Sequence, residues 1–148
     1  MKLGYLLGIA LFAAMPAWAT DAQDDAEPSI IVTVTDEELS QFLWTKRPLV
    51  VFSDSANDPR FIEQMRMIES DLHALELRDV VVLVDTDPAA RSPLRQELRP
   101  RGFALVIIGK DGASRIRKPA PWSVREISRS IDKMPARLQE IRERGTGG

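Results

Sequence analysis

Three short apolar runs without a polar interruption are the feature that most constrains how this chain can fold. They span residues 49–52, 80–84 and 103–108, and the second contains only valine and leucine. A run of this kind suits a strand that is covered on both faces, because a half-exposed strand alternates polar and apolar residues. We therefore expect a central sheet with helices on both sides.

Helical periodicity follows the first of these runs. We expect a helix that begins at Pro59 and is capped by Asp58. Its apolar residues recur at spacings of three and four, which predicts one continuous helix with a single apolar face. These residues are Phe61, Met65, Ile68, Leu72 and Leu75.

Three further helices are expected in the second half of the chain. A short polar helix is predicted over Pro93–Leu98. Ser123 is placed to cap an amphipathic helix, which Pro135 ends, and residues 136–144 predict a charged tail helix. The apolar residues of the amphipathic helix are Val124, Ile127, Ile131 and Met134.

The remaining elements lie at the two ends of the predicted domain. Residues 30–34 are β-branched and predict a first strand, and Thr35 with Glu38 has the spacing of a capping box for a short helix that ends by Pro48. Residues 109–112 predict a hairpin turn into a last strand. The order β-α-β-α-β-α-β-β-α is that of a thioredoxin-like α/β fold, with a central mixed sheet, parallel βαβ units and a C-terminal β-hairpin plus helix.

The N-terminal segment has the pattern of a cleaved leader. Lys2 precedes an apolar run that ends at Met15. Ala17-Trp18-Ala19 then has the small-x-small pattern of a signal-peptide cleavage site. The run is shorter than the roughly 18 residues that a membrane-spanning helix needs. We expect a signal peptide over 1–19, a flexible mature N-terminus over 20–28, a domain over 29–144 and a disordered tail over 145–148. The expected location is periplasmic or secreted.

Composition excludes several classes of function. The chain has no cysteine, which removes thiol redox chemistry, cysteine nucleophiles and cysteine metal ligands. It carries 20 Lys and Arg against 22 Asp and Glu, so it lacks the strongly basic balance of a nucleic-acid-binding protein. Expected partners are an envelope or secreted protein, with no nucleic acid and no membrane once the leader is removed.

A set of short segments follows along the chain in a recognisable order: 44–52, 58–60, 102–103, 109–112 and 131–135, followed by Arg137 and Glu140. Together they resemble the P-DUDES domain, a thioredoxin-like domain of unknown function in exported bacterial proteins and in repeated form in animal secreted matrix proteins. The resemblance spans residues 42–141, and Ala136 and Leu138 depart from the residues common there. It implies a thioredoxin-like fold and a secreted setting, and it implies no reaction.

The candidate site lies where the strands are expected to end. In thioredoxin-like enzymes the loop after the first central strand carries reactive thiols at the start of a helix, where the helix dipole lowers their pKa. Here the loop over 53–60 offers serines and carboxylates instead, and the cis-proline expected before Phe103 is replaced by Gly102. The candidate binding residues are Asp54, Ser55, Asp58, Arg60 and Asp85.

Two interpretations of these residues stay open. Together with Asp87, the carboxylates could converge on Ca²⁺ or Mg²⁺ through oxygen ligands, whereas the simpler interpretation makes Asp58 a helix cap and the others turn residues. Ser55 has no credible general base, since the lone histidine, His73, is expected within a helix. We assign no catalytic residue, metal or cofactor, and we expect Trp44 and Trp122 to pack.

The sequence thus supports two hypotheses of function. The first is a redox-inactive binding or interaction module that keeps a thioredoxin-like scaffold without its chemistry. The alternative is a non-thiol enzyme, with or without a metal, that uses the acidic edge at the carboxyl ends of the strands.

Overall fold

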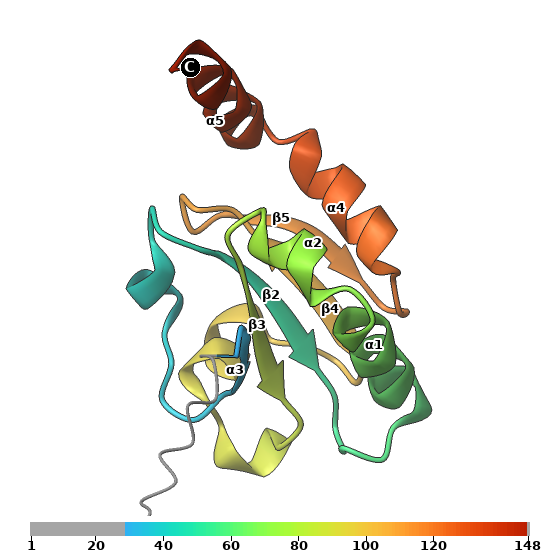
Figure 1. Ribbon diagram of the computed structural model, residues 1–148. Helices are drawn as coiled ribbons and strands as arrows, with labels where there is room; N and C mark the ends of the chain where they lie inside the picture. Colours follow the sequence, from blue (N-terminus) through green and yellow to red (C-terminus); the bar gives the residue numbers. More distant parts are fainter. Residues whose placement is uncertain (1–28, 148) are drawn as a thin grey trace, which may run out of the picture.

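The computed structural model describes residues 29–147, and the expected leader and mature N-terminus over 1–28 lie outside them (Figure 1). The strands are β1 (Ile31–Thr33), β2 (Arg47–Phe52), β3 (Val80–Asp85), β4 (Ala104–Ile108) and β5 (Ser114–Lys118). The helical segments are η1 (Leu39–Phe42), α1 (Pro59–Glu69), α2 (Leu72–Glu76), η2 (Pro88–Ala90), α3 (Pro93–Leu98), α4 (Val124–Asp132) and α5 (Pro135–Thr146).

The strands form one mixed sheet in the order β1-β3-β2-β4-β5. β3 pairs in parallel with β1 and β2, whereas β4 is antiparallel to both β2 and β5. The predicted thioredoxin-like fold, with parallel βαβ units first and a hairpin plus helix last, is confirmed. The carboxyl ends of β2 and β3 therefore share one edge of the sheet with the start of β4 and the end of β5.

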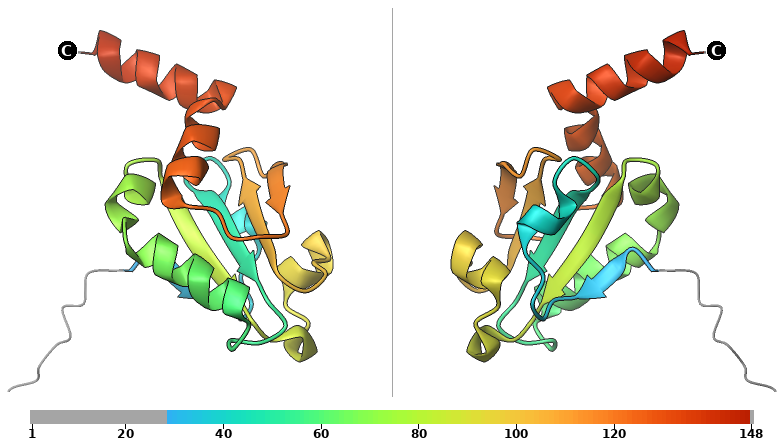
Figure 2. Two further views of the ribbon diagram at one scale, coloured as in Figure 1. Left: turned by 90° about the vertical axis from the view of Figure 1, so that its right-hand side faces the viewer. Right: turned by 90° about the vertical axis from the view of Figure 1, so that its left-hand side faces the viewer.

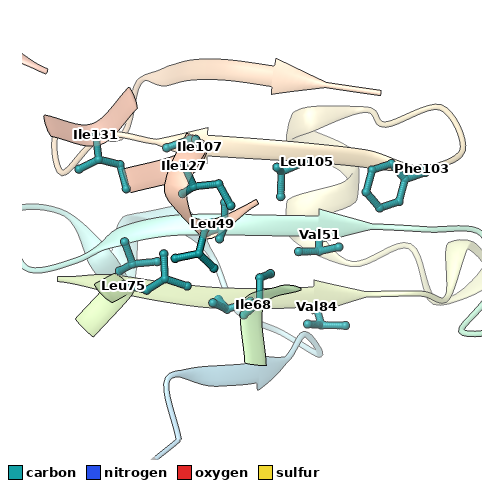
Figure 3. Close-up of a cluster of buried hydrophobic side chains, with 13 residues drawn as sticks. Leu49, Val51, Ile68, Leu75, Val84, Phe103, Leu105, Ile107, Ile127 and Ile131 are labelled. Carbon is teal, nitrogen blue, oxygen red and sulfur yellow. The ribbon is translucent and has the colours of Figure 1, made fainter. Parts of the chain in front are cut away.

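Both faces of the sheet are covered, which explains the uninterrupted apolar runs. On β2, Leu49 and Val51 pack into a cluster with side chains from α1, α2 and α4, and ten members of this cluster are labelled in Figure 3. Val50 and Phe52 point to the opposite face, where they pack with Leu39 of η1 and with residues of α3. Successive residues of one strand thus serve two cores, so neither face can be polar.

The predicted continuous helix after β2 is divided in two. α1 ends at Glu69, and the carboxylate of Asp71 caps α2 by accepting a hydrogen bond from the backbone N–H of Ala74. The two helices still present their predicted apolar residues to the core: Ile68 of α1 and Leu75 of α2 are both fully buried. Periodicity predicted the buried face correctly and missed the local capping side chain that interrupts the helix.

The capping box predicted at Thr35 and Glu38 is wrong. The short helical segment η1 is a 3-10 helix that starts at Leu39 without a side-chain cap, and the backbone N–H of Thr35 bonds to Glu37 instead. Glu37 competes successfully because its carboxylate reaches back over two residues to the same donor.

The last two helices lie end to end, with Pro135 as the first residue of the second. α4 starts with a complete capping box between Ser123 and Glu126, and α5 begins after Met134. α5 extends to Thr146, two residues beyond the expected helix end, and it projects past the end of the sheet where β2 and β3 begin (Figures 1 and 2). Within residues 29–147, no helix is long and apolar enough to cross a membrane.

Candidate functional site

The loop after β2 occupies the position where thioredoxin-like enzymes carry thiols, and short hydrogen bonds hold its shape. The buried hydroxyl of Ser53 donates to the carbonyl oxygen of Ser55 at 2.8 Å and accepts from the backbone N–H of the same residue at 3.3 Å. The hydroxyl of Ser55 accepts from the N–H of Asn57 at 3.1 Å. Ser55 is exposed, and His73 lies exposed on α2, so the structure does not assemble a nucleophile with a base.

Asp58 and Arg60 form a pair at the start of α1. Asp58 caps the helix by accepting from the N–H of Arg60 at 2.9 Å, and its other carboxylate oxygen lies 3.0 Å from Nη2 of the same arginine. The hydrogen bond from the Arg60 side chain is the main reason why the pKa of Asp58 is lowered. The Arg60 guanidinium also lies 5.7 Å from the ring centre of Phe103. This pair confirms the interpretation of Asp58 as a helix cap.

Asp85, the last residue of β3, is the most buried member of the predicted site. Its carboxylate accepts from the hydroxyl of Ser92 at 2.5 Å and from Nη2 of Arg95 at 2.8 Å. Burial raises the pKa of Asp85, but the hydrogen bonds from Arg95 and Ser92 outweigh it, so the net shift is downward. Nη2 of Arg95 also donates to the carbonyl oxygen of Ser53 at 3.1 Å, which ties the ends of β2 and β3 together.

The carboxylates at this edge do not converge on a common point. The carboxylate of Asp58 pairs with Arg60. That of Asp85 bonds to Ser92 and Arg95, and that of Asp87 caps η2. Across residues 29–147, no group of three or more His, Cys, Asp or Glu residues is arranged to hold a metal ion. The acidic edge expected from the sequence is therefore a set of separate caps and ion pairs.

A basic pocket at the same edge of the sheet was not predicted from the sequence. It has a volume of about 450 Å³ and lies where β4 begins and β5 ends. Four of its lining residues are cationic, and no lining residue is acidic: the cations are Arg99, Arg101, Arg117 and Lys118. We refer to this hollow as the basic pocket. The sequence does show basic residues before one predicted strand and at the end of the next. Only the register of the hairpin shows that these two groups of side chains lie together.

The loop that leads into the basic pocket has no cis-proline, as the sequence indicated. The peptide bonds of residues 29–147 are all trans, and Gly102 has a positive φ of 61° before β4. This conformation is open to glycine and costly for most other residues. The turn thus depends on Gly102 in the place where a cis-proline was expected.

A network of ion pairs lies at the opposite end of the sheet. Arg47, at the start of β2, is 1% exposed, and its Nη2 lies 2.7 Å from Oε1 of Glu140 in α5. Lys110 and Arg137 reach the same carboxylate at 3.0 and 3.2 Å. Burial raises the pKa of Glu140, but the hydrogen bonds from Arg47 and Lys110 prevail and lower it from 4.5 to about 2. Several segments that carried the sequence resemblance meet here.

Trp44 also lies at this end, and its expected packing role is wrong. Its side chain is 74% exposed on the rim of a second pocket, of about 690 Å³, which Arg47 and Glu140 also line. Its backbone has a φ of 64°, and its N–H donates to the carbonyl oxygen of Lys110 at 2.7 Å. By contrast, Trp122 packs against the core as expected.

Replacing Trp44 with glycine is expected to give a protein about 1 kcal/mol more stable than replacing it with alanine, because only glycine adopts this backbone conformation without steric cost. Both changes remove the same exposed ring, so the difference reports the relief of backbone strain less the unfolded-state entropy that glycine adds. Urea unfolding of the two variants measures the difference. Equal stabilities would contradict the prediction, because the strain at residue 44 would then be no larger than the entropy cost of glycine.

The fold matches solved thioredoxin-like structures. The reduced 2-Cys peroxiredoxin of Plasmodium vivax is 16% identical over 71% of this chain and 84% of that chain, with a TM-score of 0.55. Chloroplastic thioredoxin z is 20% identical over 72% of this chain and 95% of that chain, also with a TM-score of 0.55. These identities show a shared fold alone. No curated protein matches the chain.

The family is shown by a match that spans most of the domain. The profile of a domain of unknown function, DUF4174, matches residues 38–140, which is well over half of the 148 residues. The span starts before η1 and ends at Glu140, so it includes the loop after β2, the basic pocket and the ion network. The chain therefore belongs to the DUF4174 family of domains of unknown function, with a thioredoxin-like fold and no cysteine.

Proposed function

We propose that this protein is an exported, redox-inactive binding module of the P-DUDES type, which recognises a protein partner at the carboxyl ends of its central strands. The observation that carries the proposal is the loop after β2, where hydrogen-bonded serines and a helix-capping aspartate occupy the place of reactive thiols. A fixed loop without a reactive group is suited to recognition, because little conformational entropy is lost when a partner binds it.

The position of the loop supports the same proposal. Open α/β sheets bind ligands beyond the carboxyl ends of their strands, and this edge also holds the basic pocket. Asp54, Ser55, Ala56 and Asn57 are exposed in one continuous stretch, so a partner can reach them. The leader pattern over 1–19 supports export to a compartment where the partner is an envelope or secreted protein.

The enzyme alternative has less support. Two of the three carboxylates expected to take part, Asp58 and Asp85, already bind arginine, and the pKa of each is lowered. A lowered pKa keeps a carboxyl ionised at neutral pH, whereas a general acid needs a raised one. Asp54 is exposed and has no such partner among the described residues.

The absence of cysteine allows a direct test of the binding surface. A single Asn57→Cys substitution places the only thiol of the chain at the exposed loop, where it can carry a photoreactive cross-linker. Lys133→Cys, at the exposed end of α4, is the matched control at the other end of the sheet. We expect the loop probe to give one discrete cross-linked product in an envelope fraction, and the control probe to give none.

The product must also depend on the loop itself. Adding Arg60→Ala to the Asn57→Cys protein removes the guanidinium that holds Asp58 and should abolish the product. Circular dichroism and thermal unfolding show whether this variant stays folded. The same product from both probe positions, or no product from either, would rule out recognition at this edge.

A further inference from the structure

We infer that the basic pocket binds an extended acidic segment of the partner, an inference that rests on the proposed function. The pocket joins two parts of the chain that lie apart in the sequence. Arg99 and Arg101 belong to the connection between α3 and β4, whereas Arg117 and Lys118 end β5. The antiparallel pairing of Leu105 with Lys118 brings the two parts together.

The cations of the pocket are left without counterions. None of the four forms an ion pair with a carboxylate of residues 29–147, although Arg60 and Arg95 at the same edge both do. Like charges gathered in one hollow repel one another, and an anion bound between them relieves that repulsion. Arginine donates in a planar fork that matches a carboxylate, so acidic side chains suit the site.

Two of the cations are held in place by contacts that leave donors free. Nη2 of Arg117 donates to the carbonyl oxygen of Leu98 at 2.6 Å. The ammonium of Lys118 lies 4.6 Å from the ring centre of Trp122. Arg99 and Arg101 are exposed, and their side chains make no hydrogen bond within residues 29–147. The pocket thus combines positioned charges with adaptable ones.

The surface of the pocket is also partly apolar. Leu98 and Pro119 supply most of this apolar lining, since Phe103 and Ala104 also line the pocket but are almost fully buried. Neither a charged group nor a water molecule is well satisfied against such a surface. The best ligand therefore carries carboxylates on either side of an apolar side chain, rather than charge alone.

An extended segment fits because β5 is an edge strand. It pairs with β4 on one side and with no other strand of the described sheet. Its outer backbone groups can take up a further strand, which is a common mode of peptide recognition. Basic residues on an edge strand also discourage pairing between copies of the same chain. That role does not explain Arg99 and Arg101, because they lie outside β5, between α3 and β4, and add positive charge to the lining of the pocket.

The test measures binding of a defined acidic peptide to the purified protein. The probe is a fluorescent peptide in which glutamates flank a phenylalanine, and its control replaces each glutamate with glutamine. The test variant is Arg101→Glu, because this side chain is exposed and makes no hydrogen bond or ion pair within residues 29–147. The matched control is Arg142→Glu, which makes the same change of charge on the exposed surface of α5.

We expect the glutamate peptide to bind the wild-type protein, and Arg101→Glu to weaken binding about tenfold while Arg142→Glu leaves it nearly unchanged. Added salt should weaken binding, since the pocket is open to solvent. Equal losses in the two variants, or equal binding of the glutamine peptide, would overturn the inference. Free glutamate binding as tightly as the peptide would also overturn it and indicate a small-anion site.

The outcome is separable from that of the proposed function. If the peptide does not bind while the cross-linker at position 57 still captures a partner, recognition at this edge stands. The inference that the basic pocket binds an acidic segment is then wrong. If the peptide binds as expected and the cross-linker captures nothing, the pocket takes acidic segments and the loop after β2 is not part of the interface.

Discussion

Replacing Glu140 with leucine is expected to lower the free energy of unfolding by about 3 to 5 kcal/mol, the usual cost of leaving a buried charge without its partner. Glu140 is the carboxylate shared by Arg47, Lys110 and Arg137. Without it, the buried guanidinium of Arg47 keeps only the carbonyl oxygen of Arg78 as a hydrogen-bond partner among residues 29–147. Urea unfolding followed by circular dichroism measures the loss.

The control for this change lies one turn further along α5. The side chain of Glu143 is exposed and bonds only to Gln139 within the described residues, so Glu143→Leu should change stability by no more than about 0.5 kcal/mol. Adding Arg47→Met to Glu140→Leu should recover part of the lost stability, because it removes the unpaired buried charge. Equal effects of Glu140→Leu and Glu143→Leu would show that the ion network contributes nothing to stability.

The fold was predictable because local and long-range preferences agree. The run over 49–52 has no polar residue, and each of its side chains enters one of two cores. Pro59 and Ser123 start helices where their local chemistry predicts. Agreement between strand pattern, caps and turns leaves few alternative arrangements. The details that failed depend on local side-chain contacts: Glu37 rather than Glu38 accepts from the N–H of Thr35, and the carboxylate of Asp71 caps a separate helix.

The candidate site was predictable in position and not in chemistry. Asp58 and Asp85 do lie at the expected edge, but whether a carboxylate faces a metal or an arginine depends on contacts that spacing does not reveal. Asp85 meets Arg95 because α3 folds back over the end of β3.

The ion network shows the same limit over a longer separation. Arg47 and Glu140 lie 93 residues apart, and no local pattern marks them as a pair. The resemblance placed both in recurring segments without saying that they touch. Trp44 was expected to pack because tryptophan usually does, yet its ring is exposed on a pocket rim and its backbone has a positive φ. The sequence alone therefore does not reveal which charged residues pair with one another in the folded protein.

Acidification is expected to remove about 3 kcal/mol of stability through Glu140 alone, between pH 4.5 and about pH 2. Its pKa is lower in the folded protein than in the unfolded chain. The stabilisation is therefore fully present above pH 4.5 and is lost as the pH falls through the folded value of about 2. Urea unfolding across this range, for the wild type and for Glu140→Gln, measures the contribution.

Glu140→Gln is the appropriate reference because glutamine keeps an acceptor oxygen and does not titrate. Asp58 and Asp85 also have lowered pKa values, but they lie at the other end of the sheet and do not share a partner with Glu140, so their effects should cancel in the difference. The wild type should be the more stable protein at neutral pH, and the gap should close as the pH approaches 2. Parallel curves would mean that Glu140 titrates alike in the folded and unfolded chains, in which case the cations around it do not stabilise its charge.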